Sequence, residues 1–275
     1  MNKGKFILVD GTFVPTEEYR ISLFESESFH FSEKIRAIRS ALPFFRETLE
    51  LIKLKLLISN HSFPEFTDNN GAGLKRQLER TLTKNKHFMG AVLHLTFRLT
   101  NQKVHFTILS EKLDTIGFEL NEKGLYVGTF DKIQKSVSSL STLSLGSEIY
   151  WNIARNHLKN ANLDQLFLVN TDDQIVEIPG SNVYLIKGRS VRGASSEQGA
   201  YIDITRPLIL DIFSELGFEY TESEGITISA IQESDEILLA NAIEGIQWII
   251  GYEGKRFFNN TIRKINEVFN LRITN

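Results

Sequence analysis

Two stretches in the N-terminal part of the chain alternate apolar with polar residues, which is the two-residue period of a half-buried strand. GKFILVDGTFVP contains two short apolar runs separated by Asp10 and Gly11, a pair that favours a two-residue hairpin turn. GAVLHLTFRLTNQKVHFTILSE alternates over two longer runs that are separated by TNQK. Its first run places on one face Leu93, Leu95, Phe97 and Leu99. Both stretches are therefore predicted to be antiparallel hairpins, the second with one buried face.

Between these hairpins the apolar spacing changes to that of a helix. The apolar residues of LPFFRETLELIKLKLLISN recur at helical spacing, at Leu49, Ile52, Leu56 and Leu57. NGAGLKRQLERTLTKN follows a glycine-rich loop and predicts a second helix. The N-terminal part is thus predicted to combine helices with antiparallel strands.

Further along the chain, short strands alternate with helices. The pattern predicts a helix at about 147 to 160, strands at 165 to 170 and 182 to 187, and a helix at 205 to 216. Thr205 is suited to the N-cap of this last helix, and Gly217 to the left-handed position after its end. SAIQESDE predicts another helix, in which Ser229 and Gln232 have capping-box spacing. EILLANAIEGIQWIIGYEGKRF predicts two strands around a tight loop, and NNTIRKINEVFNL predicts a closing amphipathic helix.

The pattern changes in LDTIGFELNEKGLYVGTFDK, which has glycines at 117, 124 and 128. We therefore predict an α+β protein of two domains. The smaller N-terminal α/β domain is expected at residues 1–118 and the larger C-terminal one at 119–275, with a cleft between them.

Composition narrows the function classes. The chain has 275 residues, of which 41% are hydrophobic and 24% charged, as in ordinary globular proteins. It lacks an apolar run of about 18 residues, and the apolar part of its start, MNKGKFILVDG, is too short for a signal peptide, so a cytoplasmic protein without membrane association is expected. The absence of cysteine excludes a thiolate nucleophile. The six histidines show no metal-ligand spacing, so no metal site is expected.

Charge is distributed unevenly along the chain. Residues 1–110 hold 16 Lys and Arg against 11 Asp and Glu, and the remaining residues hold 15 against 23. These basic residues are interleaved with glutamates and lack a nucleic-acid-binding motif, so attraction between the two domains is the preferred interpretation and no nucleic-acid partner is expected.

Three segments carry candidate chemistry. DDQIVEIPGSNVYLIKG is a strand, a glycine-containing loop and a second strand, with Glu177 at the edge of the loop, where an isolated glutamate is usually solvated. DITRPLIL is a helix start whose backbone N–H groups favour an anion. LLANAIEGIQW is the end of a strand followed by a loop that contains Asn241. If these three loops converge, they could surround one phosphate group.

The same three segments, in this order, resemble the class IV pyridoxal phosphate enzymes, which include branched-chain and D-amino-acid aminotransferases and aminodeoxychorismate lyases. EIPGSNVY is similar to the family's glutamate followed by small residues and Ser-x-Asn-x-aromatic. DITR resembles Gly-Ile-Thr-Arg at the helix start, and NAIEGIQWI resembles the Asn-Ala-Ile-x-Gly-Ile loop. The resemblance implies the two-domain class IV aminotransferase-like fold, pyridoxal phosphate as cofactor, and a homodimer.

The resemblance also implies site residues. Glu177 matches the acid that pairs with the pyridine nitrogen of the cofactor. The backbone N–H groups of Ile204 and Thr205 match those that hold its phosphate. The remaining matched positions in these loops are Ser181, Asn182, Asn241 and Ala242.

The catalytic lysine is missing from its matched position. LSTLS lies over the family's Leu-Ser-Asn-Leu-Lys, which puts Ser144 where the lysine should stand, and serine cannot form an imine. The nearest substitute is Lys135, nine residues upstream, which would need a shifted strand or an insertion to enter the pocket. In the first domain, Thr48 and Leu51 fall on the family's His-x-x-Arg, whose arginine grips the phosphate, and SEKIRAI replaces a glycine-rich run.

Three functions stay open at this point. The first is a catalytically degenerate member that keeps the fold, the dimer and a pocket for a phosphate-bearing small molecule, with pyridoxal phosphate not bound covalently. The second is a working aminotransferase or 4-amino-4-deoxychorismate lyase that uses a relocated lysine such as Lys135. The third treats every retained residue as maintenance of the fold. Ser144 and Leu51 favour the first, whereas the retained Glu177 favours the second.

Overall fold

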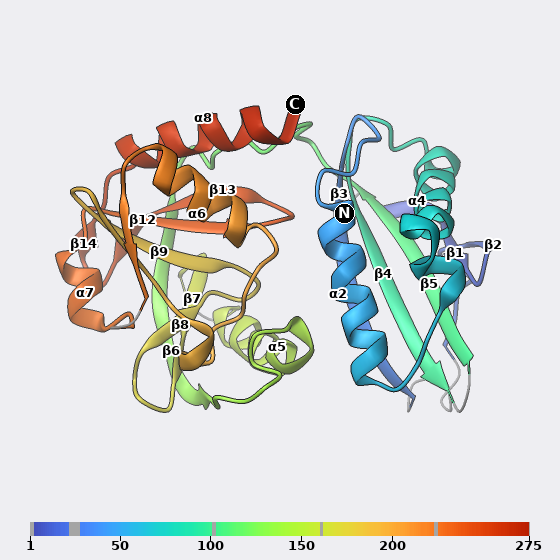
Figure 1. Cartoon of the computed structure of the whole chain (residues 1–275), viewed down its shortest axis with the longest axis horizontal. Coiled ribbons are helices and arrows are strands. Elements are labelled where there is room, and N and C mark those ends of the chain that lie inside the picture. Colours follow the sequence, from blue (N-terminus) through green and yellow to red (C-terminus); the bar gives the residue numbers. More distant parts are fainter. Residues whose placement is uncertain (1–2, 22–27, 101–102, 160–161, 223–224, 275) are drawn as a thin grey trace. The chain divides into compact units, whose positions relative to one another are not determined.

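The computed structural model describes residues 3–21, 28–100, 103–159, 162–222 and 225–274. The chain divides into two compact units, residues 1–117 and 118–275 (Figure 1). Both units combine helices with a sheet, so the fold is α+β.

The first unit contains a five-stranded antiparallel sheet in the order β2-β1-β5-β4-β3. The strands are β1 (Lys3–Val9), β2 (Thr12–Pro15), β3 (Phe29–Ile38), β4 (Gly90–Thr100) and β5 (Lys103–Lys112). Both predicted hairpins are confirmed. Asp10 and Gly11 have φ angles of 46° and 84°, so both central residues of the first turn are left-handed, as its type requires.

Among the described residues of this unit, the α-helices are α2 (Phe45–Ile58), α3 (Pro64–Thr67) and α4 (Ala72–Asn85), with a short 3₁₀ turn, η1 (Asn69–Gly71), before α4. On α2, Leu49, Ile52 and Leu56 are buried as predicted. Leu57 is 75% exposed, so its assignment to the apolar face was wrong. Consecutive helix positions lie about 100° apart, and Leu57 follows Leu56 directly.

Aromatic rings fill much of the core of the first unit. Phe31 of β3 and Phe97 of β4 are stacked with ring centroids 5.0 Å apart, and Phe66 of α3 meets Phe106 of β5 at 4.5 Å. The other face of β4 is less solvated than its alternation predicts, because Arg98 is only 8% exposed. Side chains on both faces of this strand are therefore largely covered.

The second unit contains a mixed sheet in the order β11-β10-β9-β12-β13-β6-β7-β8, with β14 paired to β13. The strands are β6 (Leu125–Lys135), β7 (Gln165–Asn170), β8 (Ile175–Glu177), β9 (Asn182–Lys187), β10 (Ser190–Gly193), β11 (Glu219–Thr221), β12 (Glu236–Asn241), β13 (Gly245–Tyr252) and β14 (Lys255–Arg256). The strands predicted at 165 to 170 and 182 to 187 are confirmed as β7 and β9. The pairs β13–β6, β6–β7 and β10–β11 are parallel.

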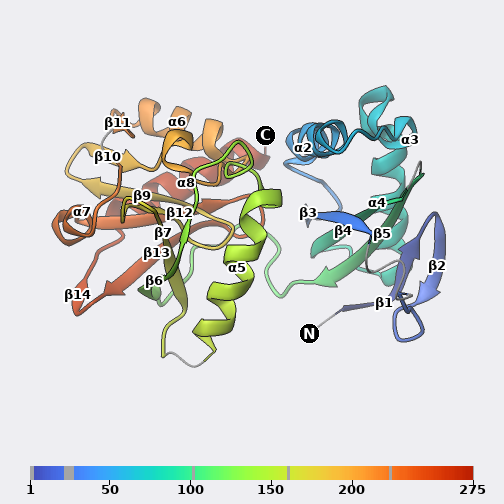
Figure 2. The same ribbon diagram turned by 90° about the horizontal axis from the view of Figure 1, so that it is seen from below.

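Helices lie on both sides of this sheet. The α-helices are α5 (Ser144–Leu158), α6 (Arg206–Glu215), α7 (Ile228–Glu233) and α8 (Asn260–Thr274), and η2 (Ser196–Gln198) is a short 3₁₀ turn. Figure 2 shows α6 and α8 on one side of the sheet and α5 on the other. The predicted helix at 147 to 160 begins earlier, at Ser144.

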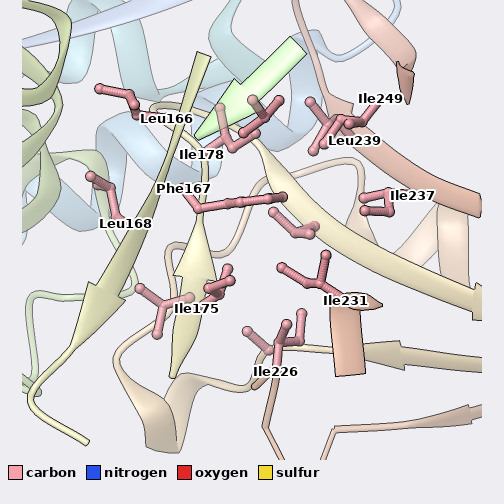
Figure 3. Packing of buried hydrophobic residues seen from close by; sticks show 14 of the residues in the cluster. Leu166, Phe167, Leu168, Ile175, Ile178, Ile226, Ile231, Ile237, Leu239 and Ile249 are labelled. Atoms are coloured by element: carbon pink, nitrogen blue, oxygen red, sulfur yellow. The ribbon is translucent and has the colours of Figure 1, made fainter. Parts of the chain in front are cut away.

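The core of the second unit joins β7, β8, β9, β12 and β13 to α5 and α7. Figure 3 shows Phe167 of β7 among buried aliphatic side chains that include Ile175 of β8 and Ile237 of β12. Each fully buried aliphatic side chain contributes about 1.5 to 3 kcal/mol relative to exposure. This core holds in place the strand ends from which the candidate site is built.

Of the two predicted helix caps, one position is confirmed and one is wrong. Thr205 is the N-cap residue of α6, although its backbone conformation is helical and its side chain makes no capping hydrogen bond. For α7 the N-cap is Thr227 rather than Ser229, because the Thr227 Oγ1 accepts a hydrogen bond from the Ala230 N–H at 3.2 Å. Gly217 is confirmed after the end of α6, with a φ angle of 73°. Within the described residues, no helix is long and apolar enough to cross a membrane.

Candidate functional site: a buried ion pair and an internally satisfied helix start

Two strands that flank β7 bring Lys135 and Glu177 together. Lys135 ends β6 and is paired with Asn170 of β7, and Glu177 ends β8 and is paired with Leu168. The pairing of β6 with β7 is irregular between Phe130 and Lys135, where five steps along β6 correspond to two steps along β7. This irregularity keeps Lys135 beside Asn170, two residues along β7 from Leu168, the partner of Glu177, and the Lys135 ammonium contacts Glu177 from there.

Lys135 and Glu177 form a fully buried ion pair. The Lys135 Nζ lies 2.6 Å from the Glu177 Oε2, and the two side chains are 1% and 0% exposed. The same ammonium group donates a hydrogen bond of 2.9 Å to the backbone carbonyl of Ser141. Glu177 is therefore not the solvated loop residue that its place in a hairpin suggests.

Two further donors complete the surroundings of the Glu177 carboxylate. The indole Nε1 of Trp151, on α5, donates to its Oε1 at 2.6 Å. The backbone N–H of Tyr201, in the loop after η2, donates to its Oε2 at 2.6 Å. The rings of Trp151 and Tyr201 also meet edge to face at 5.0 Å. The carboxylate thus joins four segments of the unit, namely β6, β8, α5 and the loop before α6.

A chain of serine hydrogen bonds shapes the segment that leads from Lys135 to α5. The Ser141 Oγ donates to the Ser136 carbonyl at 2.8 Å and accepts from the Ser138 N–H at 2.8 Å. The Ser147 Oγ donates to the Ser141 carbonyl at 3.0 Å, beside the bond from Lys135. Ser144, which the resemblance matched to the family's lysine, is the first residue of α5 and is partly exposed. The group that reaches Glu177 is therefore the Lys135 ammonium.

Burial shifts both partners of the ion pair. Removal from water raises the pKa of the Glu177 carboxyl, and the neighbouring Lys135, Trp151 and Tyr201 donors oppose that rise. Burial also lowers the pKa of the Lys135 amine, against the attraction of Glu177. Burial thus disfavours the charged form of each residue, and the charge of the other residue opposes this effect.

The start of α6 is occupied by a carboxylate of the chain itself. The Asp203 Oδ1 accepts hydrogen bonds from the Thr205 N–H at 2.9 Å and the Thr205 Oγ1 at 2.7 Å. Its Oδ2 accepts a hydrogen bond of 3.2 Å from the Tyr201 hydroxyl. Asp203 and Thr205 are 4% and 0% exposed. Ile204 lies between them and is partly exposed.

The predicted loop amides are engaged within the chain. The Asn182 Nδ2 donates to the Tyr201 carbonyl, and the Asn182 Oδ1 accepts from the Asp203 N–H at 3.0 Å. The Asn241 Nδ2 donates to the Ser181 Oγ at 2.8 Å. The Asn241 Oδ1 accepts from the N–H groups of two loop residues, Ile243 and Glu244, at 2.8 Å each. Ala242 lies in this loop and is 6% exposed.

The structure thus connects the predicted residues in three groups. Lys135 is bonded to Glu177, Asn182 reaches Thr205 through Asp203, and Ser181 is bonded to Asn241. Tyr201 links the first two groups, because its N–H binds Glu177 and its hydroxyl binds Asp203.

Four residues of this network were missed by sequence reasoning, namely Ser141, Trp151, Tyr201 and Asp203. Of these, Asp203 had a readable signal. It stands at the family's glycine position in DITR, and an aspartate two residues before a threonine can bond that residue's N–H. The other three depend on contacts between distant segments.

Two predicted positions belong to the first unit. Thr48 is buried on α2, and its Oγ1 donates to the Phe44 carbonyl at 2.8 Å within the helix. Leu51 is partly buried on the same helix, and SEKIRAI forms part of β3. Among the residues that the structure describes, no group of three or more His, Asp or Glu side chains could hold a metal ion.

Comparison with known proteins identifies the family that shares this architecture. The family model described as amino-transferase class IV matches residues 66–250. A protein of Aquifex aeolicus (strain VF5), described as "Probable branched-chain-amino-acid aminotransferase", is 21% identical over 287 aligned residues, which cover 95% of this chain and 89% of that protein.

Solved structures show the same fold. The branched-chain aminotransferase of Thermoproteus uzoniensis, solved with norvaline, has a TM-score of 0.81 at 17% identity and covers 98% of this chain and 95% of its own. The branched-chain amino acid aminotransferase of Thermobaculum terrenum, solved in its PLP form, has a TM-score of 0.80 at 14% identity, with 99% and 95% covered. At these identities the likeness concerns the fold.

Proposed function

The chain belongs to the amino-transferase class IV family, and from this premise we propose that it keeps the family's fold but performs no Schiff-base chemistry. One observation carries the proposal. The only described lysine amine bonded to Glu177 lies 2.6 Å from its carboxylate, in a position that leaves no room for a cofactor ring between them.

The geometry of pyridoxal phosphate explains why this distance matters. Bound to an enzyme lysine through its aldehyde carbon, the cofactor supplies an electron sink for reactions of amino acids. The aldehyde carbon and the ring nitrogen lie on opposite sides of the pyridine ring. A lysine that binds the first and an acid that pairs with the second must therefore be separated by the ring. Lys135 and Glu177 contact each other directly, so these residues do not fit the cofactor.

The ion pair would also be costly to open. If the Lys135 amine moved away from Glu177, it would leave a carboxylate that is 0% exposed without its countercharge. Breaking a buried ion pair by removing one partner costs about 3 to 5 kcal/mol. A cofactor would have to recover this free energy before it gained any affinity.

The other two departures from the family pattern support the same proposal. Ser144 offers a hydroxyl at the matched lysine position, and a hydroxyl cannot condense with an aldehyde to an imine. Leu51 offers no guanidinium at the matched arginine position, where a charge-assisted bidentate contact to phosphate would contribute about 1.5 to 3 kcal/mol.

A working aminotransferase or 4-amino-4-deoxychorismate lyase that uses Lys135 is the second candidate. It is favoured by the fact that the strand irregularity brings this lysine to Glu177. Burial also lowers the pKa of the Lys135 amine, and a less basic amine is more often in its nucleophilic form. This candidate requires the ion pair to open and Lys135 to move away from Glu177.

Reduction with borohydride separates the two candidates. The purified protein is mixed with pyridoxal phosphate, its visible absorption is recorded, and borohydride-reduced adducts are mapped by mass spectrometry. We expect no stoichiometric adduct at Lys135, and no transfer of amino groups from branched-chain amino acids to 2-oxoglutarate above background. A stoichiometric adduct that disappears in Lys135→Met but persists in the exposed-strand control Lys132→Met would establish the second candidate instead.

Assembly and location stay predictions. The homodimer expected from the family resemblance would be detected by light scattering as twice the mass of the chain. The cytoplasmic location would be tested by fractionation of the source cells.

A further inference from the structure

The carboxylate of Asp203 binds Thr205, the residue that directly precedes α6. Helix starts attract anions because their first N–H groups lack intrahelical partners. Here one Asp203 oxygen accepts from both the backbone N–H and the hydroxyl of Thr205, at 2.9 and 2.7 Å. We infer that Asp203 fills the position at which a phosphate group would bind, so that the chain takes up neither inorganic phosphate nor pyridoxal phosphate even without a covalent bond.

The inference rests on the proposed function, the absence of Schiff-base chemistry, and extends it to the absence of pyridoxal phosphate binding. Pyridoxal phosphate carries a ring nitrogen that needs an acid and a phosphate that needs donors. In this chain Lys135 is bonded to the acid, Glu177, and Asp203 is bonded to the donors of Thr205. The chain thus places a cation of its own at Glu177 and an anion of its own at α6.

Other hydrogen-bond donors near α6 are also bonded to acceptors within the chain. The Tyr201 N–H is bonded to Glu177, and the Asn182 amide is bonded to the Tyr201 carbonyl. The Asn241 amide is bonded to Ser181, and also to the Glu244 carboxylate at 3.2 Å. An incoming phosphate would have to displace these internal acceptors and also face the charge of Asp203.

One polar group beside α6 has no such partner. The hydroxyl of Tyr184 is buried, and no described residue forms a hydrogen bond with it. Tyr184 and Asn182 are two residues apart on β9, so their side chains lie on the same face of the sheet. This face packs against α6, where the Tyr184 ring lies 5.3 Å from the Phe213 ring. The charges of Asp203 and Arg206 are close enough to influence the pKa of the Tyr184 hydroxyl, although burial is the main cause of its rise.

The test follows the Thr205 amide directly. Protein labelled with ¹⁵N-threonine is titrated with inorganic phosphate, and the Thr205 amide resonance is recorded for the natural chain, Asp203→Gly and Asp203→Asn. Asp203→Gly restores the glycine of the family pattern, and Asp203→Asn removes the charge at nearly the same volume. Asp211→Asn, on the exposed side of the same helix, is the matched control.

We expect the Thr205 resonance of the natural chain and of the Asp211→Asn control to ignore millimolar phosphate. In Asp203→Gly it should move saturably, with at least a tenfold gain in affinity over the natural chain, and Asp203→Asn should show a smaller gain. A saturable shift in the natural chain would overturn the inference, as would the lack of any shift in the folded variants. If Asp203→Gly does not fold, the natural chain and Asp203→Asn decide the outcome.

The result is independent of the borohydride experiment. An adduct at Lys135 combined with a Thr205 amide that does not respond to phosphate would refute the proposed function and the exclusion of pyridoxal phosphate, but the exclusion of inorganic phosphate by Asp203 would stand. Phosphate binding by the natural chain without any adduct would refute the inference about Asp203 and leave the proposed function standing. The chain would then have kept a phosphate site but lost the Schiff-base reaction.

Discussion

The Lys135 ammonium and the Glu177 carboxylate lie 2.6 Å apart, and neither side chain is more than 1% exposed. This pair connects the ends of β6 and β8 across β7. Trp151 and the Tyr201 N–H bind the same carboxylate, so a single charged group holds together the strand ends, α5 and the loop before α6. Under the proposed function, the acid that the resemblance matches to the cofactor ring binds a lysine of the chain instead.

Removing the cation should destabilise the second unit strongly. Lys135→Met leaves Glu177 buried without a countercharge, and we expect the free energy of unfolding to fall by about 3 to 5 kcal/mol in urea denaturation. The double variant Lys135→Met/Glu177→Gln removes both charges but keeps an acceptor oxygen for only one of the two donors, Trp151 and Tyr201, so it should regain part of the loss. Lys132→Met, on an exposed position of the same strand, should change little. Equal losses in the single and double variants would show that the lysine acts through packing rather than charge.

The contribution of Trp151 and Trp248 to the free energy of unfolding should depend on which group accepts the hydrogen bond of each indole N–H. Trp151 donates to the Glu177 carboxylate at 2.6 Å, whereas Trp248 donates to the backbone carbonyl of Asn121 at 2.7 Å. Both are nearly buried, at 6% and 7% exposure, so replacement by phenylalanine removes similar packing. A hydrogen bond to a charged group contributes about 1.5 to 3 kcal/mol and a neutral one about 0.5 to 1.5 kcal/mol. Trp151→Phe should therefore cost about 1 kcal/mol more than Trp248→Phe in urea denaturation, and a larger loss for Trp248→Phe would contradict this.

Acid should weaken the first unit through His87. Burial, and to a lesser degree the charge of Lys112, lower the pKa of this imidazole below its usual value of 6.5. The unfolded chain therefore binds the proton more readily than the folded one. As pH falls from 6.5 toward the lowered pKa, the free energy of unfolding should decline, with at most about 1.4 kcal/mol per pH unit from this group.

Thermal unfolding of His87→Gln and of the exposed control His30→Gln between pH 7.5 and 5.5 tests this relationship. The natural chain and His30→Gln should lose stability over this range more steeply than His87→Gln. Parallel curves for all three would place the acid sensitivity elsewhere in the molecule.

Much of the fold could be predicted because the chain's local signals agree with its tertiary structure. The Asp10-Gly11 turn was correctly identified from a local pattern, because two left-handed residues in succession are favoured by this residue pair. Strands β7 and β9 are buried apolar runs bounded by polar residues, and their limits matched the prediction. The prediction that Leu57 lies on the buried face was wrong, because apolar character alone does not show which of two adjacent helix positions is buried.

The candidate site was less accessible to sequence reasoning, because its main contacts depend on tertiary structure. The family resemblance singled out Glu177 but not its partner. That partner depends on an irregular register between β6 and β7, which has no recognisable signature in the sequence. Trp151 and Tyr201 reach Glu177 from segments that are 26 and 24 residues away along the chain. Asp203 could have been identified from the sequence. It replaces the matched glycine of the family pattern, and its carboxylate binds the N–H of Thr205.

The start of α7 offers a last prediction in which pattern and structure name different residues. The spacing of Ser229 and Gln232 favours Ser229 as the cap. In the structure, however, the Thr227 Oγ1 accepts a hydrogen bond from the Ala230 N–H at 3.2 Å, and the Ser229 hydroxyl is bonded to the Thr227 Oγ1 at 2.9 Å. Replacing a capping threonine with alanine costs about 1 kcal/mol, since it leaves an N–H without its partner. We therefore expect Thr227→Ala to lower the free energy of unfolding by about this amount and Ser229→Ala to lower it by clearly less. Urea denaturation of the two variants compares them directly, and a larger loss for Ser229→Ala would restore the sequence-based assignment.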